Sequence, residues 1–255
     1  MLKFPQIIVR KASTKIVTWS DGTDEEIKAM LEAADAGKIN LSDYWSVGDE
    51  RTVHLSAMTA GDGLNTAQPE QDVIHVLMDT GENSGYTDVN GKPVNFVWGQ
   101  KDCLYATGRM NTSNTNTGSW NGCAMRADLN DKYYNALPAT YKSCLKQFNV
   151  ITAQTYNGST NQTSLDYVSL FAAKEFFGSQ AGSNAKEAAV LKRIKYYETA
   201  ANIIKKLPAN DSAYPWFLRS PVSTATTDYC RVTGTGSAAT TYAATRNGVA
   251  PFGCI

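Results

Sequence analysis

The stretch from Trp216 to Ile255, W216-F-L-R-S-P-V-S-T-A-T-T-D-Y-C-R-V-T-G-T-G-S-A-A-T-T-Y-A-A-T-R-N-G-V-A-P-F-G-C-I255, differs in composition from the rest of the chain. After Trp216 it contains no Lys, Gln, Glu, Met or Trp, although these five residue types make up 44 of the 255 residues. They are also the amino acids that no codon ending in a pyrimidine encodes. Such a segment is expected where the adenines of repeated adenine-adenine-pyrimidine codons are replaced at random.

The tail combines residues that can hold a backbone in place with residues that suit a binding surface. We predict a hairpin-like β face. Its predicted framework residues are Trp216, Leu218, Arg219, Cys230, Val232, Gly236, Gly248, Val249 and Pro251. The residues predicted to point outward and bind a ligand are Ser223, Thr226, Asp228, Arg231, Thr233, Ala239, Thr240, Thr241, Tyr242, Thr245 and Arg246. Exposed side chains tolerate exchange, and Tyr, Ser, Asn and Arg are typical of adaptable binding surfaces.

Within this predicted face, Tyr242, Tyr229, Arg231 and Arg246 are the expected affinity anchors because aromatic and arginine side chains contribute most to binding. The alternative is a threonine-rich polar edge without a partner. The alanines between Ser237 and Thr245 favour that alternative, since alanine supplies little binding energy.

Charge and hydropathy exclude several classes of partner. The 24 basic and 24 acidic residues cancel, and there is no basic block, so we expect no nucleic-acid partner and no anionic-membrane partner. Apolar runs are far shorter than the roughly 20 residues of a membrane helix. Residues 1–11 lack the uninterrupted apolar segment of a signal peptide, so export by the usual route is not expected.

No pattern in the chain indicates catalysis or a cofactor. The five cysteines have no C-x-x-C spacing, so we expect no metal and predict reduced, mostly buried thiols. No G-x-S-x-G, H-E-x-x-H or P-loop occurs, and we predict no catalytic residues and no cofactor. Gly234 to Ala239 matches a relaxed dinucleotide fingerprint, but too few residues follow for the helix, second strand and acidic residue that it requires.

The upstream chain predicts an α+β fold. Residues 1–40 are expected to be a small attachment or packing segment, with strands at 7–9 and 16–19. A helix is expected after Thr23, which has capping-box spacing to Glu26; its apolar face is formed by Ile27, Met30, Leu31 and Ala34, and Gly37 ends it.

Alternation predicts strands at 45–58, with Val53 and Leu55 inward, and at 71–79; His54 and His75 within them are expected to be structural. Further predictions are a polar loop at 111–122, a helix at 120–136, a strand within 165–177 followed by a turn at Gly178, and a helix at 185–207. Irregular interleaving of strands with few helices favours α+β over a doubly wound sheet.

The quoted motifs carry a family resemblance. W216-F-L-R-S-P, the Ser/Thr/Tyr/Asp-rich run and G248-V-A-P-F-G-C-I255 resemble the variable region of target proteins of diversity-generating retroelements. The segments D43-Y-W-S-V-G-D-E-R-T-V-H-L-S-A-M, M110-N-T-S-N-T-N-T-G-S-W and Y196-Y-E-T-A-A-N-I-I-K-K-L resemble a domain of phage structural proteins and gut bacterial prophages. Trp216-Phe217 stands where relatives often have Trp-Trp.

The resemblance implies a C-type-lectin-like domain over 41–255, related to formylglycine-generating enzymes, with short antiparallel strands, long loops and a variable region at about 216–255. It implies a non-enzymatic binding protein diversified by adenine-directed mutagenesis and displayed on a phage tail in the virion, or on a bacterial cell surface. The implied partners are a host cell-surface protein or glycan, other phage tail proteins, and further copies in a homo-oligomer, commonly a trimer. Two alternatives are a cysteine-dependent oxidoreductase, in which Cys230 and Cys254 approach each other, and a lectin-like structural protein of fixed specificity.

Overall fold

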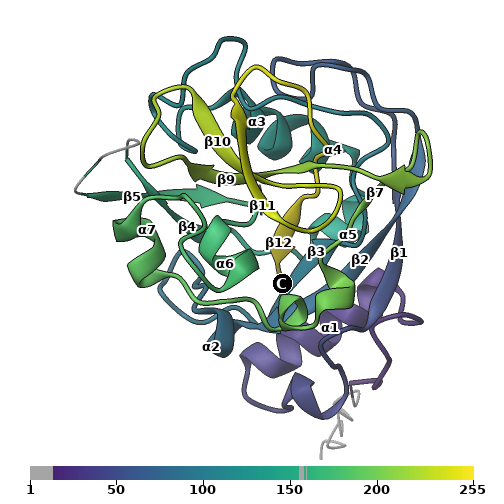
Figure 1. The fold of residues 1–255 in the computed structure, drawn as a ribbon. Coiled ribbons are helices and arrows are strands. Elements are labelled where there is room, and N and C mark those ends of the chain that lie inside the picture. Colours follow the sequence, from purple (N-terminus) through teal and green to yellow (C-terminus); the bar gives the residue numbers. More distant parts are fainter. Residues whose placement is uncertain (1–13, 155–157, 159) are drawn as a thin grey trace, which may run out of the picture.

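A five-stranded antiparallel sheet with the strand order β1-β2-β3-β12-β6 forms the centre of the fold (Figure 1). The computed structural model describes residues 14–154, 158 and 160–255. The strands of the sheet are β1 (Glu50–Leu55), β2 (Gln71–Thr80), β3 (Phe96–Gln100), β6 (Val168–Ser169) and β12 (Phe252–Cys254). The last strand in sequence thus lies inside the sheet, between β3 and β6.

Three smaller antiparallel sheets complete the β-structure, and the α+β prediction is confirmed at this coarse level. They are a three-stranded sheet of β9 (Trp216–Pro221), β10 (Asp228–Val232) and β11 (Ala238–Tyr242), the pair β4 (Phe148–Ala153) and β5 (Asn161–Asp166), and the pair β7 (Lys206–Leu207) and β8 (Ser212–Ala213). Of the strand predicted at 45–58, residues 50–55 form β1, with Val53 and Leu55 buried, and the strand predicted at 71–79 is present as β2.

The N-terminal helix α1 (Asp24–Asp35) begins as predicted. Thr23 accepts a hydrogen bond from the Glu26 amide, and the Glu26 carboxylate accepts one from the Thr23 amide. Ile27, Met30 and Leu31 are buried, and Ala33 is buried in place of Ala34, which is half-buried. These side chains belong to the same core cluster as the main sheet, so α1 packs on the body of the protein.

The segment before α1 is not the strand predicted at 16–19. It is irregular and ends in a turn at Trp19, whose ring lies edge-on to Trp45 with the centroids 5.7 Å apart. The Trp45 indole donates to the Val17 carbonyl, which satisfies this backbone group without a neighbouring strand. The strand predicted at 7–9 lies outside the described residues.

Two shorter predictions, one of a helix and one of a strand, need correction. The helix predicted from Trp120 begins only at Ala124 and runs to Ala136, through α3 (Ala124–Asp128), the π-helical turn η2 (Leu129–Tyr133) and α4 (Tyr134–Ala136). Residues 173–177, predicted as strand, form α6 (Ala173–Phe177), because the Glu175 carboxylate accepts from the Ala172 amide and nucleates the turn. Gly178 ends α6 with φ of 73°, as a C-terminal glycine does.

The prediction of a helix over 185–207 is mostly wrong. Only α7 (Ala185–Val190) is helical, and short turns η3 (Lys195–Glu198) and η4 (Ala200–Asn202) follow. Tertiary hydrogen bonds replace helical ones: the Ile194 amide donates to the Glu175 carbonyl and the Lys195 amide to Asp79. The remaining helical elements are η1 (Leu41–Asp43), α2 (Gly81–Ser84) and α5 (Ala139–Lys142).

Candidate ligand-binding face

The tail is held in the core at both of its ends. All six residues of β9 are buried, and so are the three of β12, which pairs with β3 and β6. Residues 222–249, here called the excursion, connect β9 to β12; Tyr229, Cys230, Val232 and Ala243 within it are buried in the core. The exposed side chains of the excursion can therefore vary without loss of the two strands that attach it.

Arg219 attaches β9 through a buried ion pair. Its guanidinium donates to both carboxylate oxygens of Glu175, at 2.6 and 2.9 Å, and to the carbonyls of Leu170 and Ile151. Both charged side chains are almost fully buried, at 0% and 2% exposure. This bidentate geometry compensates for the desolvation of the two charges and holds β9 against α6.

Gly248 closes the excursion against the start of β9. Its amide donates to the Pro215 carbonyl and its carbonyl accepts from the Phe217 amide. A Cβ at this position would lie 2.5 Å from the Cys103 sulfur, so only glycine fits. Trp216, Gly248 and Val249, all predicted as framework residues, are buried.

The predicted β face is a hairpin formed by β10 and β11. Asp228 lies opposite Tyr242 and Val232 opposite Ala238, and the connecting turn places Gly236 at φ of 84°. In that turn the Thr233 side chain accepts from the Ser237 amide. Positive φ favours glycine, which explains Gly236 as a framework residue.

Most residues predicted to point outward are accessible. Thr226, Thr240, Tyr242, Thr245 and Arg246 are exposed, and Ser223, Asp228, Arg231, Thr233 and Ala239 are half-buried. Tyr242 is 56% exposed, which makes it the large apolar side chain of the face. The structure thus brings ten of the predicted positions to the surface of the excursion.

Two predictions about this face are wrong. Thr241 is buried, at 9% exposure, because alternate residues of β11 point to opposite sides and Thr241 points inward with Tyr229 opposite it. Tyr229, expected as an affinity anchor, is fully buried and donates its hydroxyl to the Ser119 carbonyl. Arg231, also expected as an anchor, is half-buried and donates to the Asn247 side chain.

Sequence reasoning missed the support that the polar loop 111–119 gives to this face. Asn116 is 1% exposed, and its side-chain amide donates to the carbonyls of Ala225 and Asp228, each bond 2.7 to 2.9 Å long. The Asn116 amide donates to the Thr226 carbonyl, and the Asn114 side chain accepts from the Ala244 amide. The asparagines that indicated a loop are therefore the groups that position the excursion.

A family described as a domain of unknown function, DUF6273, matches residues 99–255. The chain belongs to the DUF6273 family. No curated protein and no solved structure matches it. The matched region contains the polar loop 111–119, Arg219, the excursion and β12, so the face and its supports all lie within the DUF6273 region.

The five thiols of the DUF6273 protein are free and buried, as predicted. Burial raises the pKa of Cys103 and Cys123 to about 12 and that of Cys144 to about 11, and it raises the pKa of Cys230 and Cys254 further. Thiolate catalysis requires an accessible thiol with a lowered pKa. Cys230 and Cys254 have neither property.

Both histidines have structural partners. His75 is fully buried, stacks on Trp98 with the ring centroids 3.9 Å apart, and is hydrogen-bonded by the hydroxyls of Tyr133 and Tyr141. Burial lowers the pKa of His75 to about 3, so its imidazole is neutral. His54 is exposed between Asp72 and Glu70, whose charges and hydrogen bonds raise its pKa. In the described part of the chain, no cluster of His, Cys, Asp and Glu is placed to hold a metal ion.

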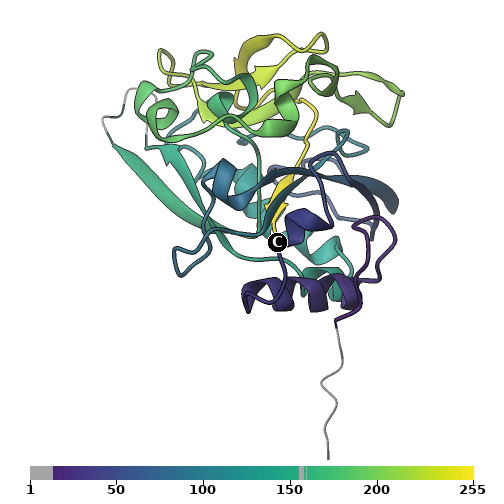
Figure 2. The same cartoon turned by 90° about the horizontal axis from the view of Figure 1, so that it is seen from below.

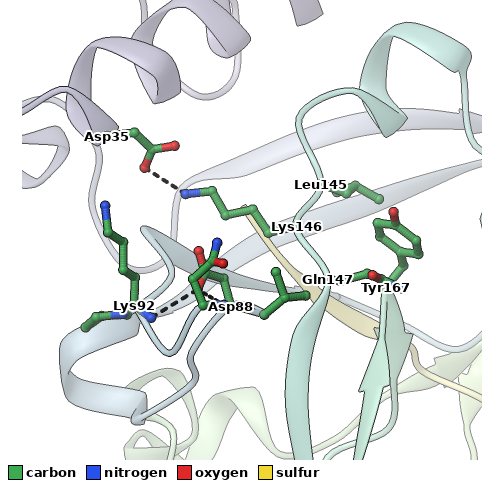
Figure 3. Close-up of a pocket in the computed structure, with 10 residues that line it drawn as sticks. Asp35, Asp88, Lys92, Leu145, Lys146, Gln147 and Tyr167 are labelled. Carbon is green, nitrogen blue, oxygen red and sulfur yellow. Dashed lines mark hydrogen bonds and ion pairs between the residues drawn. The ribbon is translucent and has the colours of Figure 1, made fainter.

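A pocket of about 640 Å³ lies beside the end of α1, away from the excursion (Figure 3). Asp35 and Lys146 point toward one another there and form an ion pair of 2.7 Å. Asp88 accepts from the backbone amides of Asn90 and Lys92. Asp35, Lys146 and Asp88 are thus bound to other groups of the protein. Across the described residues, no helix has the length and apolarity needed to span a bilayer.

Proposed function

We propose that this DUF6273 protein is a non-enzymatic binding protein whose excursion recognises a ligand with a variable set of side chains. The fold we propose for it is a C-type-lectin-like domain, and the source of variation is adenine-directed retroelement mutagenesis. The observation that carries the proposal is the division of the tail. The predicted framework residues other than Gly236 are buried, whereas ten of the eleven candidate contact residues reach the surface.

The shape of the molecule supports display at the end of a larger assembly. Figure 2 shows α1, in purple, at the opposite end from the sheet of β9, β10 and β11, in yellow-green. Attachment through the α1 end leaves the excursion directed away from the assembly. We propose a phage tail, or a bacterial cell surface, as the site of display, with a host surface molecule as ligand. A homo-oligomer would raise the avidity of weak individual sites.

Deep sequencing of the gene from a natural population tests the variation. We expect substitutions to cluster at the codons for residues 223–246, to occur at adenine positions, and to spare the codons for Trp216, Gly236 and Gly248. Codons 50–100, which encode the β1 to β3 half of the main sheet, serve as the internal control. Equal variation in the two regions would contradict the proposal and leave a lectin-like structural protein of fixed specificity.

A further inference from the structure

Strand β11 is the outermost strand of its sheet, which has the order β11-β10-β9. Hydrogen bonds at both ends of the hairpin fix which of its backbone groups face β10. The Ala243 amide donates to the Thr227 carbonyl and the Thr233 amide to the Ser237 carbonyl. Hydrogen-bonded residue pairs in an antiparallel ladder recur at every second residue. The backbone amides and carbonyls of Ala239 and Thr241 therefore face β10.

The backbone groups of Ala238, Thr240 and Tyr242 consequently point away from β10; we call them the free edge. Within the described chain, no hydrogen bond involves the amides of these three residues or the carbonyls of Ala238 and Thr240, whereas the Tyr242 carbonyl accepts from the Thr245 amide. All three residues are exposed. The free edge is therefore a row of solvated donors and acceptors about 6.8 Å apart.

Strand β11 carries none of the usual features that prevent another strand from pairing with an edge. Natural edges are blocked by lysine, proline, inward-pointing charge, bulges or a covering loop. The sequence Ala238-Ala-Thr-Thr-Tyr242 contains no charge and no proline, and its pairing with β10 is regular over all five residues. Three of the five are Thr or Tyr, which have high β-propensity.

We infer that the free edge binds an extended segment of a protein ligand, which adds to the sheet as a fourth strand beside β11. The inference rests on the proposed function and narrows its ligand class. Alternating amide and carbonyl groups complement the backbone of an extended polypeptide, whereas a glycan has no matching row of amides. Backbone pairing also survives side-chain exchange, so the edge would supply a constant part of the affinity while the neighbouring side chains set specificity.

Proline substitutions at neighbouring positions test the two edges of β11 one at a time. Thr240→Pro removes an outward amide, and proline is tolerated at that position of an edge strand, so thermal stability should stay close to that of the original protein. Thr241→Pro removes an amide of the ladder with β10 and should lower the melting temperature. Thr240→Val keeps the outward amide and loses only the hydroxyl, which makes it the matched comparison for binding.

The probe is a linear peptide recovered from a displayed library of random twelve-residue sequences selected on the full chain. Its Kd is measured by fluorescence polarisation with a labelled synthetic copy. We expect Thr240→Pro to bind about tenfold more weakly than Thr240→Val, since a lost backbone hydrogen bond has about that effect. Amide exchange by NMR should slow at Thr240 and Tyr242 on peptide addition, while Ala239 and Thr241 stay slow throughout.

Three outcomes would overturn the inference. If the two Thr240 variants bind equally and edge exchange is unchanged, while Tyr242→Ala or Arg246→Ala weakens binding, the face binds through side chains alone and the proposed function stands. If the free protein sediments as a dimer with protected edge amides, a second copy occupies the edge. If the library yields no binding peptide, the edge does not capture extended chains, and population sequencing still tests the proposed function separately.

Discussion

Arginines of the tail have different roles in the structure, although they are the same residue type. The tail contains three arginines, and the sequence predicted one as framework and two as ligand contacts. Arg219 is buried on Glu175, Arg231 is half-buried on Asn247, and Arg246 is exposed. The framework role was predictable because Arg219 lies within a buried β-strand pattern. The hydrogen bond of Arg231 was not predictable, since its partner Asn247 comes from the returning leg of the excursion.

Replacing Arg219 by methionine should destabilise the protein by about 3–5 kcal/mol, because the Glu175 carboxylate would remain buried without its cation. Urea unfolding measures the change. Arg246→Met, at an exposed position of the same tail, should change stability by no more than about 0.5 kcal/mol.

The double variant Arg219→Met with Glu175→Leu provides a further check on this ion pair. It should recover part of the loss, because the buried Glu175 charge is removed together with its cation, while the buried Glu187 still loses the nearby Arg219 charge. A double variant that is less stable than Arg219→Met would show that the hydrogen bonds that Glu175 accepts from the Ala172 amide and the Tyr86 hydroxyl matter more than the charge balance.

At the scale of elements, secondary structure set by neighbouring residues was predicted correctly, whereas secondary structure set by contacts distant in sequence was not. The helix at 24–35 carries its own cap and stop, and it forms where predicted. Over 185–207 the apolar spacing also suited a helix, yet Ile194 is buried from extended backbone and Tyr197 from the single turn η3. Lys205, near the end of the predicted helix, is buried and donates to the carbonyls of Gln100 and Lys101. Partners so distant in sequence leave no periodic signal.

Asn116 should be the residue of the polar loop on which the excursion depends. Asn116→Ala would leave the carbonyls of Ala225 and Asp228 without their donor, and should cost about 1–3 kcal/mol in urea unfolding. Asn114→Ala is the matched control, because Asn114 is exposed and makes one bond to the excursion. Equal effects of the two variants would mean that the loop contributes only by its length.

At the scale of the whole molecule, burial of the thiols makes stability depend on alkaline pH. The pKa of each cysteine is raised by burial, so each thiol stabilises the fold below about pH 9 and loses that contribution as pH rises toward its folded pKa. At pH 10 the free energy of unfolding should be lower by about 1 kcal/mol for each thiol. Lys205 acts in the opposite sense, because burial lowers its pKa to about 8, but one lysine does not offset five thiols.

Urea unfolding between pH 7 and pH 10 should therefore show falling stability. In the native protein at pH 8, a thiol reagent should react slowly, and unfolding should release five reactive thiols. Fast native labelling that Cys230→Ser or Cys254→Ser abolishes would contradict the buried assignment and favour the oxidoreductase alternative.

The position of β12 has a consequence for gene expression. The ribosome must translate the whole excursion before residues 252–254 emerge, and the main sheet lacks a strand between β3 and β6 until then. A frameshift or premature stop introduced into the excursion therefore yields a chain that cannot complete its sheet, and proteases remove such chains. An intact reading frame through the excursion is thus a condition for a complete main sheet.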